Sequence, residues 1–185
     1  DENKSSISHK IYVRPLMKPY PNAQDSTVEF IPDEVLIVDK IHEAVRRLYT
    51  PEAGQIAPTV KVINLSIGIG ARMYYNMISP LAKLLDWLSL KYRVLFIVSA
   101  GNHNDDVDLD MPFEAFRALD FSQRDAGIIG LLNRNSRNLR LLSPAESMNS
   151  LTVGALFADK SEWTENPRQV LPCSSSLPSP ISSLG

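Results

Sequence analysis

The stretch VLFIVSAGNHN, residues 94–104, decides the fold. Its apolar first half has the length and the β-branched content of a strand that is covered on both faces. The run then stops at small residues and at Gly101-Asn102. Glycine lets another backbone approach, and an asparagine amide offers a pair of N–H donors. The pattern fits either an ordinary turn asparagine or a donor held at the end of a buried strand.

The neighbouring segments predict strands and helices that alternate along the chain. The segment KVINLSIGIG, residues 61–70, is an apolar run ended by glycines and predicts another covered strand. Ser79-Pro80 supplies an N-cap followed by proline, and leucines at helical spacing predict a helix over 79–92. A last strand is predicted over 151–157. This order predicts an α/β fold with right-handed crossovers, in which a mostly parallel sheet is flanked by helices.

The remaining segments carry weaker patterns. Ile11–Val13 predicts a short strand, followed by a loop because prolines come next. Apolar residues at helical spacing predict a helix over 33–49, with acidic residues at its start and arginines near its end. Residues 103–142 read as an acidic loop with a short helix, and the Ser- and Pro-rich residues 173–185 predict a loop.

Composition limits the kind of protein and its partners. The chain has 185 residues, 44% of them hydrophobic, which suits one globular domain. A formal net charge of -2 argues against nucleic acid or an anionic membrane as partner. One cysteine excludes an internal disulfide and a multi-thiolate zinc site within the chain. With no signal-peptide pattern and no apolar run of about 18 residues, a cytoplasmic location is slightly favoured.

Four blocks occur in a fixed order: VINLSIG, VLFIVSAGN, SPAESMNSLTVGA and SSLG. Together they resemble the subtilisin-like serine proteases, the subtilase family S8. The resemblance implies a three-layer α/β/α fold, present here as one partial domain with a family-variable insertion over 103–142. It implies that the carbonyl oxyanion is bound by Asn102, and that substrate is bound by two cleft segments: Ser66, Ile67, Gly68 and Ser99, Ala100, Gly101.

The resemblance also implies what the chain does. The family cleaves peptide bonds through a serine acyl-enzyme with an Asp, His and Ser triad and needs no organic cofactor. None of the motifs D-[ST]-G, H-G-T or G-T-S occurs in the sequence, so we expect these 185 residues to be inactive without flanking parts of the same protease domain. The small Ser99 and Ala100 predict a pocket that accepts sizeable apolar side chains of a polypeptide substrate.

Two other functions remain open. A non-catalytic relative, a pseudoprotease, would bind peptides through the same cleft. A doubly wound module for nucleotides or small ligands is less favoured, because neither G-x-G-x-x-G nor a P-loop lysine is present.

The other polar residues are assigned structural or solvent-exposed roles. The histidines His9, His42 and His103 and the nucleophile types Cys173, Ser174, Ser175 and Ser176 are interpreted as structural or solvated. The acidic residues Asp105, Asp106, Asp108 and Asp110 are carboxylates of the kind that bind calcium, but they lack the glycine and glutamate of a calcium loop. We therefore predict no metal site, with structural calcium as the alternative. Arg134, Arg137 and Arg140 predict a surface helix or loop rather than a nucleic-acid site.

Overall fold

The computed structural model describes residues 10–19, 29–103 and 110–156. The chain divides into two compact units, residues 1–60 and residues 61–185. Among the helices of the described ranges, none has the length and apolar character needed to cross a membrane.

The first unit contains a short antiparallel pair and one helix. Strand β1 (Lys18–Pro19) pairs with β2 (Glu29–Phe30), and helix α1 (Ile37–Tyr49) is followed by the 3-10 turn η1 (Pro51–Ala53). The helix buries a stripe formed by Ile41, Val45 and Leu48. Burial raises the pKa of Tyr49, whose hydroxyl donates to the carbonyl oxygen of Val60 at 2.9 Å.

Two predictions for this unit are wrong. Ile11–Val13 forms no strand, and Ile11 and Val13 are each 76% exposed, because pairing with a partner begins only at Lys18. The helix begins at Ile37 rather than at Asp33. The reason is a turn closed by the hydrogen bond from Val35 N to Pro32 O, 2.9 Å, after which Leu36 is still extended. The acidic residues Asp33 and Glu34 therefore precede the helix.

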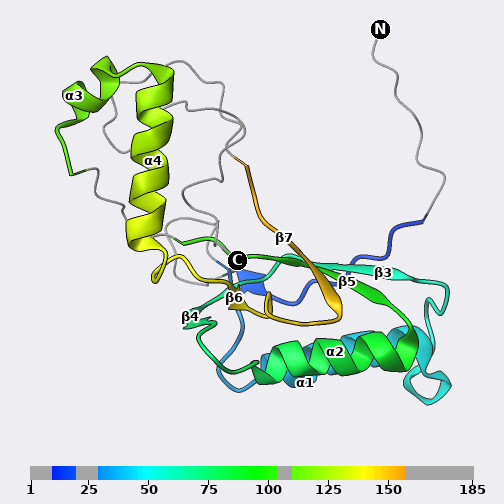
Figure 1. Ribbon diagram of the computed structural model, residues 1–185. Helices are drawn as coiled ribbons and strands as arrows, with labels where there is room; N and C mark the ends of the chain where they lie inside the picture. Colours follow the sequence, from blue (N-terminus) through cyan, green and yellow to red (C-terminus); the bar gives the residue numbers. More distant parts are fainter. Residues whose placement is uncertain (1–9, 20–28, 104–109, 157–185) are drawn as a thin grey trace, which may run out of the picture. The chain divides into compact units, whose positions relative to one another are not determined.

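A parallel sheet forms the centre of the second unit. It contains β3 (Val62–Leu65), β5 (Leu95–Ser99) and β7 (Ser150–Val153) in the order β3-β5-β7, all parallel. Helix α2 (Pro80–Tyr92) connects β3 to β5 and runs along the strands (Figure 1). These two strands are adjacent, with the helix as their crossover, and the predicted α/β class with a parallel sheet is confirmed.

Helix α2 covers one face of this sheet. Its Leu85 and Leu88 are 0% exposed, as is Phe96 of β5, and α2 contacts both β5 and β7. On the other face Val62 is 53%, Leu151 51% and Val153 48% exposed. Cover on both faces, predicted from the apolar strands, is therefore absent among the described residues. The apolar second face agrees with the partial domain that the resemblance implies.

The predicted strand over 61–70 is two strands. After β3 the chain turns, with Ile67 N donating to Leu65 O at 2.9 Å, and continues as β4 (Ile69–Met73). Strand β4 pairs antiparallel with β6 (Leu142–Ser143) in a separate sheet. Strand β7 ends at Val153, before the Leu156 expected within it, while Phe157 lies outside the described residues.

Residues 110–135 form more helix than the sequence analysis predicted. Helix α3 (Phe113–Ala118) is followed by the 15-residue α4 (Phe121–Asn135). A capping box begins α4, since Asp120 and Gln123 exchange side-chain to backbone hydrogen bonds. Gly127 allows α4 to lie against α3, because a Cβ there would be 3.3 Å from Phe116 Cε2.

Candidate functional site

The candidate site lies where β3 and β5 end. The register pairs Leu65 with Val98, and β5 ends at Ser99, so residues 66–68 and 100–102 leave the sheet at the same edge. Ligands of open parallel sheets bind at this edge. The two segments approach closely, because a Cβ on Gly68 would be 3.2 Å from Gly101 Cα. The structure thus brings the two predicted cleft segments together.

Backbone hydrogen bonds hold the end of β5 from both sides. Ala100 N donates to Val153 O at 2.9 Å, and Ala100 O accepts from Leu142 N at 3.0 Å. Gly101 N donates to the Ser99 hydroxyl at 3.1 Å. The backbone that leads into Asn102 is therefore fixed by β7, by β6 and by its own preceding serine.

Gly101 occupies a position that only glycine fills without strain. Its φ is 111°, and a Cβ there would lie 2.5 Å from Leu142 Cγ. Both the backbone conformation and the space exclude a side chain. The glycine therefore lets β6 pack directly against the segment that carries Asn102.

Asn102 is exposed at the end of this fixed segment. Among the described residues, no hydrogen bond of its side-chain amide is found. In the opposite segment Ser66 and Gly68 are exposed and Ile67 is half-buried, and the Ser66 hydroxyl lies 3.2 Å from Asn64 Nδ2. The side chain of Ala100 is buried.

His103 follows Asn102 but is a packing residue. It is only 8% exposed, and its Nε2 lies 2.9 Å from the carbonyl oxygen of Arg140. The side chain thus helps to attach the end of β5 to the segment before β6. His42 lies on α1, half-buried, in the other unit. His9, Cys173 and Ser174–Ser176 lie outside the described residues.

A polar cluster joins the start of α2 to the loop after β6, and the sequence analysis missed it. Ser79 N donates to Glu146 Oε1 at 3.0 Å, and the Ser79 and Ser143 hydroxyls lie 2.6 Å apart. Further along α2, Asp86 Oδ1 accepts from Ser147 Oγ at 2.7 Å and from Asn149 N at 2.8 Å. Nothing in the local sequence pairs residues so far apart in the chain.

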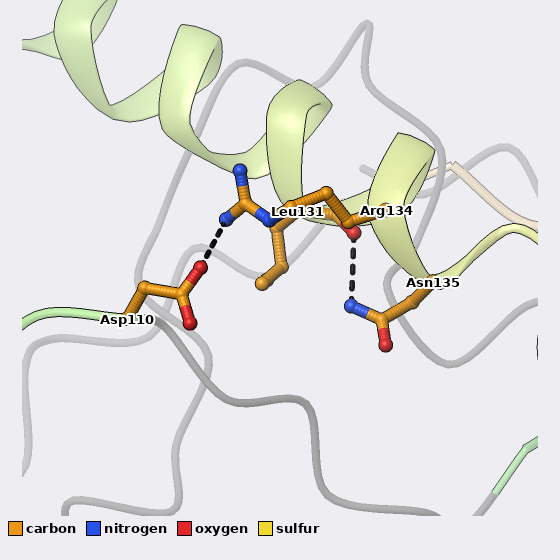
Figure 2. Close-up of polar contacts among 4 residues, drawn as sticks. All are labelled: Asp110, Leu131, Arg134 and Asn135. Atoms are coloured by element: carbon orange, nitrogen blue, oxygen red, sulfur yellow. Dashed lines mark hydrogen bonds and ion pairs between the residues drawn. The ribbon is translucent and has the colours of Figure 1, made fainter.

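The predicted acidic loop falls mostly on 104–109, which the structure does not describe. Asp110 is described, and its carboxylate forms an ion pair with Arg134 on α4, 2.8 Å, beside the bond from Asn135 to Leu131 O (Figure 2). The two side chains are 65% and 57% exposed, so the pair adds little stability. Within the described ranges no group of three or more acidic, His or Cys side chains could hold a metal ion.

We expect Gly101→Ala to destabilise the protein strongly. The positive φ costs about 1–2 kcal/mol for a residue with a Cβ, and the contact with Leu142 adds about 1–3 kcal/mol of overpacking. Gly70→Ala is the matched control, because a Cβ at Gly70 meets nothing within 4 Å. Its effect should stay within about 0.5 kcal/mol. Urea unfolding midpoints measure both, and equal midpoints for the two variants would contradict the packing described for Gly101.

Comparison with known protein families identifies a match. The model of the subtilase family, Peptidase_S8, matches residues 34–185, which is most of the chain. No curated protein and no solved structure matches it. The matched region contains both segments of the candidate site and the β3-α2-β5 unit that positions them. The chain therefore belongs to the subtilase family of serine peptidases, which are hydrolases.

Proposed function

We propose that this chain forms the substrate cleft and the oxyanion-binding part of a subtilisin-like serine endopeptidase. The supporting observation is the end of β5. Its backbone is held by the hydrogen bonds of Ala100 with Val153 O and Leu142 N, and the exposed Asn102 follows.

Asn102 is assigned to the oxygen of the scissile carbonyl. When a serine attacks the peptide carbonyl, the C=O double bond becomes a single bond and its oxygen becomes an anion. A Nδ2–H donor that is already in place stabilises this anion without reorganisation during the reaction. The rigid backbone from Ser99 to Gly101 provides that fixed placement.

The polypeptide substrate is assigned to the space along the two segments that leave the sheet. An extended peptide that adds to a strand edge gains backbone hydrogen bonds, which are independent of its sequence. The exposed Ser66 and Gly68 belong to one wall, and the residues Ser99–Gly101 belong to the other.

The nucleophile, the base and the orienting acid are assigned to flanking parts of the same protease domain. The 185 residues contain no D-[ST]-G, H-G-T or G-T-S motif, and the two described histidines are placed on α1 and against Arg140 O. Alone, the chain is therefore inactive. No organic cofactor is required, and structural calcium at the acidic loop remains the alternative to an unliganded loop. For the compartment, a cytoplasmic location is proposed from the single cysteine.

A pseudoprotease is the second candidate, and only the sequence on either side of these 185 residues discriminates it from a peptidase. It would use the same cleft to bind peptides without cleaving them. Covalent labelling of a serine nucleophile separates the two.

The chain of 185 residues by itself should not react with a fluorophosphonate probe, whereas the complete protein should be labelled at one serine outside it. The reason is that the probe reacts with an activated nucleophile, and the triad motifs that supply one are absent from these 185 residues. Mass spectrometry of the labelled peptide reports the site. Stoichiometric labelling at any serine of residues 1–185 would refute the assignment, and absence of labelling in the complete protein would favour the pseudoprotease.

Asn102→Ala in the complete protein should lower kcat by about 10²–10³-fold and leave KM nearly unchanged. This magnitude is the one established for an oxyanion donor of subtilisin, a member of the same family, and is not obtained from the present structure. Steady-state kinetics on active-site-titrated protein measures it. Asn133→Ala, at an exposed asparagine on α4, is the control and should leave kcat unchanged. A kcat within about threefold of wild type for Asn102→Ala would make Asn102 a turn residue.

A further inference from the structure

Leu142 occupies the place where the two walls of the cleft meet. Its Cδ1 lies 3.4 Å from where a Cβ of Gly68 would be and 2.8 Å from where a Cβ of Gly101 would be. The same methyl carbon thus lies close to both glycines. The side chain is 2% exposed and ranks among the largest that are fully buried. The space behind the two glycines is therefore filled by this chain's own leucine.

The position of Leu142 is fixed by its surroundings. Its N–H donates to Ala100 O at 3.0 Å, and its carbonyl oxygen accepts from Ala145 N at 2.9 Å. The next residue, Ser143, is 1% exposed, and its hydroxyl contacts that of Ser79 at the start of α2. Moving the leucine would break these contacts, so the leucine is part of the wall rather than a flexible cover.

We propose that Leu142 determines specificity: it closes the space between the two walls, so that the cleft takes substrates with glycine, alanine or serine before the scissile bond. The proposal rests on the proposed function, which places the substrate between these walls. It replaces the expectation of a pocket for sizeable apolar side chains, which was based on the small Ser99 and Ala100. Those two residues are small, but the room they leave is occupied by a residue that is distant in the sequence.

Packing explains the expected size of the selectivity. A protein interior has few voids, and a side chain that enters filled space forces its neighbours out of place. In apolar pockets a single methylene changes kcat/KM by about 10–200-fold. A phenylalanine side chain is larger than that of alanine by far more than one methylene. We therefore expect kcat/KM to be at least about tenfold higher for alanine than for phenylalanine.

The test uses the complete protein and a series of peptides that differ only in the residue before the scissile bond: Gly, Ala, Ser, Leu and Phe. For wild type, kcat/KM should be at least about tenfold higher with Ala than with Phe. Leu142→Ala should lower the ratio of kcat/KM for Ala to kcat/KM for Phe at least about tenfold. Leu142→Val removes less of the side chain and should shift the Ala-to-Phe ratio of kcat/KM in the same direction. This variant keeps the test decisive if Leu142→Ala does not fold. Leu88→Ala, the same truncation at a leucine of α2 that is also fully buried, is the control and should leave the ratio unchanged.

Two readouts separate the failure of this inference from that of the proposed function. The role of Leu142 would be overturned if the wild type preferred Phe, or if the Ala-to-Phe ratio of kcat/KM were unchanged in folded Leu142→Ala and Leu142→Val. Cleavage of the peptides would still support the peptidase activity. If none of the peptides is cleaved, the proposed peptidase activity is overturned instead. In that case isothermal titration calorimetry with the same peptides tests the role of Leu142. Tighter binding of the Ala peptide than of the Phe peptide supports this role. Equal binding of the two peptides, or no binding of either, overturns it.

Discussion

The contact between Gly101 and Leu142 is the constraint on which the rest of the site depends. A Cβ at Gly101 would lie 2.5 Å from Leu142 Cγ, so β6 approaches the end of β5 only because residue 101 has no side chain. This approach gives Ala100 O its partner, Leu142 N, and completes the fixation of the segment that leads to Asn102. One close contact thus fixes the backbone before the proposed oxyanion donor and also fills the space beside it.

The loop after β6 transmits this constraint to the core of the unit. Helix α2 packs on the sheet through Leu85 and Leu88, and its polar side holds the loop through Ser79 and Asp86. Hydrogen bonds to a charged group such as Asp86 contribute about 1.5–3 kcal/mol each. The helix that crosses from β3 to β5 therefore also positions the chain that closes the cleft. The fold and the proposed specificity thus depend on the same packing.

Local sequence predicted the parts of the fold that are periodic. The apolar runs of β3 and β5 and the Ser79-Pro80 start of α2 each carry their own signal, and Figure 1 shows them in the predicted arrangement. The predicted start of α1 at Asp33 is wrong because the hydrogen bond from Val35 N to Pro32 O places Asp33 in a turn instead of a helix. Helix α4 was missed, although Asp120 and Gln123 gave a capping-box signal. The packing of Leu142 beside Gly68 and Gly101 could not be predicted, because it depends on contacts between distant segments.

The most direct test of the central claim is a crystal structure of the complete protein with a peptide boronic acid, which mimics the tetrahedral intermediate once the nucleophile has added to boron. Our account predicts that the oxygen representing the oxyanion lies about 2.7–3.1 Å from Asn102 Nδ2. It also predicts an unchanged backbone from Ser99 to Gly101. A complex in which this oxygen is bound by other donors, with the Asn102 amide turned away, would contradict the account.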